Sequence, residues 1–322
     1  MLTTRFTKLV GCRVPLQQAG MGGIATPPLV LAVAEAGGLG MLGAAMVPPH
    51  VLAGALEDLA KRTDGAFGVS FLMPFLDRDA VAVAATRSRV VEFFYAEPDA
   101  TLVEIVHAGG ALACWQVGSV EEAVAAARAG CDIVVAQGAE AGGHVRGRVG
   151  LLPLLGAVLD AVDVPLVAAG GIATARSMAA ALAAGADAVR VGTRFVAAAE
   201  SDTHPDYVAA LVGAGAEDTV LTERFSVMWP GAPHRVLRSA VAAAEACRDE
   251  VVGEMEMLGV RQPLPRFAVP CPTRSTTGRV AAMALYAGES VGAVRGITPA
   301  ADIVHELAVG AEQLLRNWAR GT

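Results

Sequence analysis

A histidine behind a run of small residues is the first feature that could do chemistry. Residues 136–147 read AQGAEAGGHVRG and directly follow the apolar run 132–135. Glycine lets a backbone pass close to a ligand. An imidazole titrates near neutral pH, so it can accept or donate a proton. A solvent-exposed loop histidine is the alternative, and His144 becomes a candidate catalytic residue only if other loops converge on it.

Two further glycine-rich turns lie in residues 164–195, VPLVAAGGIATARSMAAALAAGADAVRVGTRF. Gly170-Gly171 and Gly192-Thr193 each end an apolar run and precede a helical pattern. Helix N-termini carry unpaired N–H groups and a positive dipole end, which suit a phosphate. Tight turns with threonine caps would explain one such loop, but the two together favour a phosphate site. A monophosphate is favoured because the chain has no G-x-x-x-x-G-K-[ST] motif.

The elements that must position these loops alternate along the first 192 residues. Continuous apolar runs are typical of parallel strands buried on both faces. The predicted strands are 15–19, 39–42, 68–71, 90–93, 111–115, 132–136, 165–168 and 188–191, and the predicted helices include 28–36, 49–61, 120–129, 151–161 and 175–184. Eight such units favour an α/β protein with a TIM (β/α)8 barrel over an open doubly wound sheet. No G-x-G-x-x-G follows the first strand, which also favours the barrel.

The alternation ends near residue 200. Residues 201–298 contain two proline-rich stretches and less regular periodicity, so we predict a mostly helical insertion or substrate-side subdomain there. A helix near 300–320 would close the barrel, which then comprises residues 1–200 and 299–322. The stretch MWPGAPHR, residues 228–235, is either a lid or a packing corner.

Composition restricts the class of protein. Hydrophobic residues make up 54% of the 322 residues and charged residues 18%, which is enough for a large core. No long uncharged apolar stretch or signal-peptide pattern is present, so we expect a soluble, cytoplasmic protein with no membrane partner. The net charge of −7 argues against nucleic acid as a partner. Five scattered cysteines without a C-x-x-C pair predict neither disulfides nor a metal site. A homodimer is left open.

Three stretches together resemble a known family. The motif at 136–147, the stretch 164–195 and the opening segment PLQQAGMGGIATPPLVLAVAEAGGLGMLG at 15–43 look like nitronate monooxygenases, formerly called 2-nitropropane dioxygenases. This group of FMN-dependent TIM barrels also includes flavin-dependent enoyl-ACP reductases and NAD(P)H:quinone reductases. The resemblance runs from about residue 5 to 205 and is loose in the last third.

The resemblance implies an FMN site at the carboxyl ends of the strands. It implies that His144 carries proton transfer or substrate binding. The implied contacts to the phosphate are Gly170, Gly171, Gly192 and Thr193, and those beside the ring are Gly20, Met21 and Gly22. Gln137, Gly142 and Gly143 would lie near the ring and the ribityl chain. Two further implied contacts are the strand-end side chains Ser70 and Gln116. Ser70 stands where many relatives have asparagine, so its flavin hydrogen bond is left open. Arg190 stands where an amide is common, and it either helps to hold the phosphate or points elsewhere.

Three activities follow as alternatives. The leading one is the oxidation of an alkyl nitronate with O2 to a carbonyl compound and nitrite, which needs no nicotinamide. The second is an NAD(P)H-dependent reduction of an enoyl thioester or a quinone, with the same FMN and with His144 as proton donor. The third is a flavin-binding scaffold without turnover. The partner in the first two is a small-molecule substrate.

Overall fold

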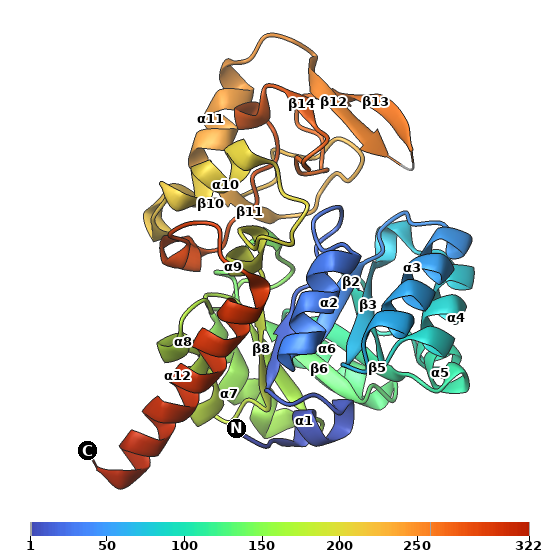
Figure 1. The fold of residues 1–322 in the computed structure, drawn as a ribbon, viewed down its shortest axis with the longest axis vertical. Helices are drawn as coiled ribbons and strands as arrows, with labels where there is room; N and C mark the ends of the chain where they lie inside the picture. Colours follow the sequence, from blue (N-terminus) through green and yellow to red (C-terminus); the bar gives the residue numbers. More distant parts are fainter. Residues whose placement is uncertain (1, 258, 322) are drawn as a thin grey trace.

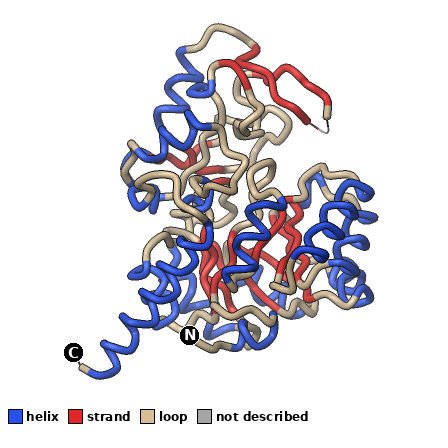
Figure 2. Tube along the Cα trace, viewed as in Figure 1, coloured by secondary structure: helices blue, strands red, loops and turns tan. Residues whose placement is uncertain are grey.

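A sheet of eight parallel strands forms the centre of the chain in this computed structural model, which describes residues 2–257 and 259–321. The strands are β1 (Leu16–Gln18), β2 (Gly40–Gly43), β3 (Phe67–Leu72), β4 (Val90–Phe94), β5 (Leu112–Val117), β6 (Ile133–Gln137), β8 (Leu166–Ala169) and β9 (Ala188–Val191). They are paired in the order β1-β9-β8-β6-β5-β4-β3-β2. Helices surround this sheet on its outside (Figure 1, Figure 2).

The two ends of this order meet and nearly close the sheet into a barrel. Leu39, directly before β2, forms a parallel bridge with Gln17 of β1. The Gln18 N–H donates to the Leu39 carbonyl at 2.9 Å, and the Leu39 N–H donates to the Leu16 carbonyl at 2.8 Å. The predicted TIM barrel is therefore confirmed. Each predicted strand lies within two residues of the observed one.

The helices of the barrel connect successive strands and cover their outer faces. In chain order the helices of the whole structure are α1 (Arg5–Val10), α2 (Pro27–Ala36), α3 (Pro49–Arg62), α4 (Arg78–Arg87), α5 (Ala100–Gly109), α6 (Val120–Arg128), α7 (Leu151–Ala161), α8 (Ala175–Ala183), α9 (Thr193–Val196), α10 (Pro205–Val212), α11 (Arg238–Ala246) and α12 (Ala300–Arg320). The predicted closing helix is α12, which packs against α8 and α2 (Figure 1).

The inside of the barrel is apolar at one end and polar at the other. Successive side chains of a strand point to opposite faces. In β4, Val91 and Phe93 face the helices, whereas Val90 packs in the barrel interior with Phe6 of α1. Glu92 lies one step further along the inner face, and Phe94 follows at the carboxyl end. The polar layer therefore lies directly below the ends of the strands.

Residues 201–298 lie over the carboxyl ends of the strands, at the top of Figure 1. Their helices α10 and α11 agree with the predicted helical character, and this part also contains strands that the sequence did not indicate. These are β10 (Thr219–Thr222), β11 (His234–Leu237), β12 (Val251–Met257), β13 (Val260–Pro265) and β14 (Thr277–Gly278). A second apolar cluster, which includes Tyr207, Phe225 and Val236, fills the interior of this part.

One short strand connects the two parts. β7 (Gly143–His144) belongs to the loop after β6 and pairs antiparallel with β11, with His144 opposite His234. The Val145 N–H donates to the Pro233 carbonyl at 2.9 Å, next to this pair. The histidine loop is therefore held by backbone hydrogen bonds. Among the described helices, none combines the length and apolarity needed to cross a membrane.

Candidate active site

A cavity of about 420 Å³ opens at the carboxyl ends of the barrel strands. This size lies within the range of pockets that hold cofactors and drug-sized ligands. Of the predicted site residues, those that line it are Gly20, Met21, Gly22, Gln116, Gln137, Gly142, Gly143, His144, Gly170, Gly171, Gly192 and Thr193. The structure thus brings together the loops that follow β1, β6, β8 and β9 with a side chain from the end of β5.

Ser70 is the one member of the predicted set that does not line the cavity. Its side chain is buried and its Oγ donates to Glu92 Oε1 at 2.9 Å. A Cβ atom on Gly20 would clash with the Ser70 Cβ, so the glycine backbone lies directly over this side chain. Ser70 therefore supports the loop after β1 and belongs to the polar layer below the cavity.

The two glycine pairs on the phosphate side adopt different conformations. Gly170 and Gly171 have φ values of 112° and 65°, a left-handed conformation that side chains disfavour. The helix after them, α8, begins four residues later and is capped by its own Thr174–Ser177 hydrogen bonds. Gly192 directly precedes α9, which has only four residues. A ligand on this side would therefore meet loop N–H groups more than the helix N-termini that the sequence predicted.

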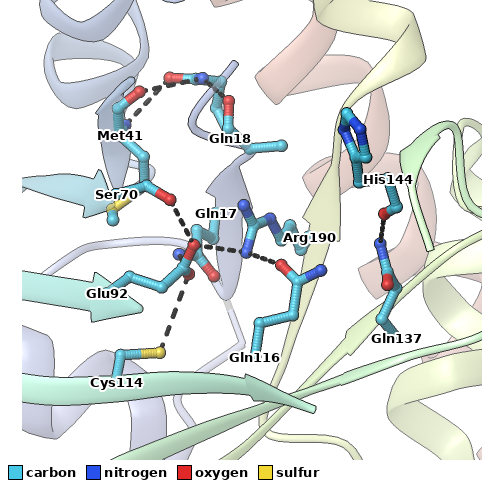
Figure 3. A network of polar contacts seen from close by, with 11 residues as sticks. Gln17, Gln18, Met41, Ser70, Glu92, Cys114, Gln116, Gln137, His144 and Arg190 are labelled. Atoms are coloured by element: carbon cyan, nitrogen blue, oxygen red, sulfur yellow. Dashed lines mark hydrogen bonds and ion pairs between the residues drawn. The ribbon is translucent and has the colours of Figure 1, made fainter. Parts of the chain in front are cut away.

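The histidine loop is tightly fitted on the opposite side of the cavity. A Cβ on Gly142 would clash with the backbone of Gly288, so the loop passes directly against this later segment. Gln137 Nε2 donates to the His144 carbonyl at 3.0 Å (Figure 3). The Gln137 Oε1 and His144 Nε2 atoms are both buried and have no hydrogen-bond partner among the described residues. Because buried polar atoms are nearly always satisfied, these two need a partner from outside the chain, such as a ligand atom or a water.

Aromatic rings surround the imidazole of His144. Trp229 stacks on it, with centroids 4.0 Å apart, and Tyr95 meets it edge-on at 5.9 Å. Tyr286 and His234 lie at 5.6 and 5.3 Å. His234 Nδ1 lies 2.8 Å from the Ala232 carbonyl, and its Nε2 accepts from the Phe225 N–H at 3.2 Å, as in a neutral ring.

Burial controls the charge of His144. Desolvation, with a smaller effect of His234, lowers its pKa to about 3. Burial also lowers the pKa of His234. A neutral imidazole carries one donor and one acceptor nitrogen, so His144 can offer either at neutral pH.

The segment 228–235, predicted to be either a lid or a packing corner, both lines the cavity and packs behind His144. Met228 lines the cavity and has a φ of 83°. Trp229 is buried behind His144 and also packs edge-on against Tyr95 and Phe75, as a packing corner would. The sequence indicated the segment but could not assign these separate contacts.

Below the cavity lies a buried charged network (Figure 3). Glu92 is fully buried and contacts four side chains: Gln17 Nε2 at 2.8 Å, Ser70 Oγ at 2.9 Å, Arg190 Nη1 at 2.6 Å and Cys114 Sγ at 3.8 Å. Arg190 Nη1 also donates to Gln116 Oε1 at 2.5 Å. Glu92 was not among the predicted site residues, although a single acid in the apolar strand VVEFF is a signal that could have indicated it.

Comparison with known proteins agrees with this geometry. The model of the family "Nitronate monooxygenase" matches residues 3–81 and 75–310. A curated protein of Rhodococcus jostii, named (3aS,4S,5R,7aS)-5-hydroxy-7a-methyl-1-oxo-octahydro-1H-indene-4-carboxyl-CoA dehydrogenase, is 40% identical over 240 residues, which cover 74% of this chain and 66% of that protein. The chain thus spans slightly less than two thirds of that relative.

Two solved structures match almost the whole chain. FabK from Thermotoga maritima has a TM-score of 0.81 and 30% identity, with 100% of both chains covered. Nitroalkane oxidase from Streptomyces ansochromogenes has a TM-score of 0.78 and 29% identity, with 98% of this chain and 99% of that chain covered. With the barrel, the glycine-lined cavity and the family match taken together, the chain belongs to the nitronate monooxygenase family of oxidoreductases.

Proposed function

We propose that the chain is an FMN-dependent oxidoreductase that acts on the thioester of a bulky apolar acid. The observation that carries this proposal is the mixed lining of the cavity. Part of the lining is glycine backbone from the loops after β1, β8 and β9, and part is apolar side chains, which come from the loops after β2 and β3 and from the part above the barrel. Such a cavity suits a flat cofactor on one side and an apolar substrate on the other.

The residues present fit FMN. Left-handed Gly170 and Gly171 leave loop N–H groups free of side chains, which suits a phosphate. The unpartnered Gln137 Oε1 can accept from a polar ring or ribityl group. FMN, when bound, supplies the electron transfer, and the protein supplies binding, orientation and electrostatics.

His144 is the group proposed to bind the reacting carbonyl of the substrate. Since burial holds its pKa at about 3, the ring is neutral at physiological pH. The neutral ring can donate a hydrogen bond to a thioester carbonyl, whereas a pKa this low makes it a weak base toward an acidic carbon. Trp229 and Tyr95 hold the ring plane, so the imidazole meets the substrate in one orientation.

The substrate side of the cavity is rich in methionine. It is lined by Met46, Met228, Met255, Met257 and Phe75. Methionine is flexible and polarizable, so such a wall adapts to an irregular apolar group. The relative that is 40% identical is named for a bicyclic carboxyl-CoA, which supports a substrate of this class for the present chain. NAD(P)H is the expected reductant if the thioester is reduced.

Oxidation of alkyl nitronates with O2 is the second candidate. The family match and the similarity to a nitroalkane oxidase favour it. A nitronate is a small anion, and His144 with nearby backbone N–H groups could hold its oxygens. The apolar wall would then contribute little to the binding of a short nitronate.

A competition between the two substrate classes tests the proposal. We would compare kcat/KM for apolar acyl-CoA thioesters of increasing ring size with kcat/KM for ethyl- and propyl-nitronate, the latter followed by nitrite release. The proposal expects kcat/KM to rise with the apolar volume of the acyl group and to exceed that for nitronates. Fast nitrite release together with no turnover of any thioester, in either redox direction, would overturn it.

A further inference from the structure

The Arg190 guanidinium lies in the polar layer of the barrel, directly below the cavity. Its Nη1 is shared between Glu92 Oε1 at 2.6 Å and Gln116 Oε1 at 2.5 Å. Its partners come from β4 and β5, across the barrel from β9. The cation therefore sits toward the barrel axis, whereas Gly192, two residues later, lies at the rim of the cavity.

The other two nitrogens of the Arg190 guanidinium, Nε and Nη2, have no hydrogen-bond partner among the described residues. Neither atom is completely buried, because neither is among the described polar atoms that are buried without a partner. Since the side chain is 8% exposed and lines the cavity, its free N–H groups face the cavity. Figure 3 shows these nitrogens turned away from Glu92 and Gln116.

An arginine held in this way is a rigid fork of donors. One edge of the guanidinium is fixed by a buried carboxylate and an amide, and the other edge meets whatever occupies the cavity floor. Its natural ligand is a flat group with adjacent acceptor atoms. The proposed phosphate loops lie at the rim of the cavity, whereas Arg190 lies near the barrel axis. A phosphate bound by those loops would therefore not be the ligand of Arg190.

We propose that Arg190 donates from its free edge to the carbonyl-bearing pyrimidine edge of the FMN ring, and that the Glu92–Arg190 pair sets the reduction potential of the flavin. This inference rests on the proposed binding of FMN. Reduced FMN carries more negative charge on this edge than oxidised FMN does. A cation there favours the reduced form, and a carboxylate behind the cation opposes it.

Opposite charge changes on the two residues give the test. Arg190→Gln removes the cation and should shift the reduction potential to a more negative value. Glu92→Gln removes the opposing carboxylate and should shift it to a more positive value. A tenfold change in the relative affinity for reduced and oxidised FMN corresponds to about 30 mV for a two-electron couple. We expect shifts of at least this size, measured by anaerobic dye titration.

Flavin binding distinguishes the ring from the phosphate. For Arg190→Gln we expect the affinities for FMN and riboflavin to fall by the same factor, because both flavins share the ring. Arg190→Lys keeps the charge but not the fork, so it should restore most of the potential and little of the affinity. If the Arg190 variants fail to fold, the positive shift in Glu92→Gln carries the test.

Three outcomes would overturn the inference. They are an unchanged potential in a variant that retains FMN, shifts of the same sign in Arg190→Gln and Glu92→Gln, or a loss of FMN affinity with riboflavin affinity unchanged. A wild-type protein that binds no FMN would instead refute the proposed function, so the two failures are distinguishable.

Discussion

His144 and Trp229 lie nearly parallel, with ring centroids 4.0 Å apart and an angle of 20° between their planes. His144 lines the cavity, and Trp229 supports the imidazole from behind. The two rings come from the loop after β6 and from the segment before β11, so the stack depends on the pairing of β7 with β11. The part above the barrel therefore sets both the orientation and the charge of the proposed catalytic imidazole.

Removal of the imidazole should separate flavin binding from turnover. We expect His144→Ala to bind FMN with the wild-type stoichiometry, because the phosphate loops are on the other side of the cavity. Its kcat should fall about 10²- to 10³-fold, the usual cost of removing one hydrogen-bond donor to a developing oxyanion. Flavin content and steady-state kinetics measured on one preparation check this, and a wild-type rate would contradict the proposed contact of the imidazole with the substrate.

The low pKa of His144 should make stability depend on pH. Its pKa is about 3 in the folded chain and near 6.5 when unfolded, so the unfolded state binds an extra proton between these values. This stabilisation is complete above pH 6.5 and is lost as the pH falls toward 3. The free energy of unfolding of the wild type, relative to His144→Gln, should fall by about 2 kcal/mol between pH 7 and pH 5.

Urea titrations at several pH values measure this difference. His50→Gln serves as the matched control, because it removes an exposed histidine from α3. A difference between wild type and His144→Gln that does not change with pH would show that the imidazole is not held neutral by burial.

Removal of the stacked indole should release His144 from its low pKa. In Trp229→Ala we expect the pKa of His144, followed by NMR, to rise from about 3 toward 6.5, because water reaches the ring. The space left by the indole should also lower the free energy of unfolding by about 3–5 kcal/mol. Trp229→Phe keeps an aromatic ring and should give a smaller change in both quantities. No movement of the pKa in Trp229→Ala would contradict the role of the stack.

A side chain on the phosphate side should release FMN. Gly171 has a φ of 65°, which a β-branched side chain disfavours, and its Cβ would lie 3.1 Å from the Glu140 Cγ, so Gly171→Val strains the loop. We expect FMN affinity to fall at least about tenfold, equivalent to 1.4 kcal/mol. Gly54→Ala is the control, because an added Cβ there on α3 meets nothing within 4 Å. Equal flavin content in both variants would remove the phosphate assignment.

The barrel could be predicted from sequence because its signals are local. Strands such as Leu166–Ala169 are short buried apolar runs, and α7 follows the predicted range 151–161 residue for residue. Each such element is specified by consecutive residues and flanked by clear turns. The loops after the strands could be assigned to one edge for the same reason, since all parallel strands place their carboxyl ends together.

The surroundings of the site could not be predicted, because they depend on contacts between distant residues. Tyr95, His144 and Trp229 meet only through the fold, and β7 is a two-residue strand that pairs with a partner about ninety positions later. The side-chain directions of Ser70 and Arg190 also depended on Glu92, a residue from a third strand. A single sequence contains no local signal for these contacts.

The most direct test of the account is the visible absorbance of the purified protein before and after anaerobic mixing with an apolar acyl-CoA thioester. The account predicts a yellow protein with one FMN per chain. It also predicts that the saturated thioester bleaches the flavin, or that the unsaturated thioester reoxidises flavin first reduced by NAD(P)H. Both changes should be at least about 10²-fold slower in His144→Ala. A colourless protein that takes up no FMN, or a flavin that responds to nitronates and to no thioester, would contradict it.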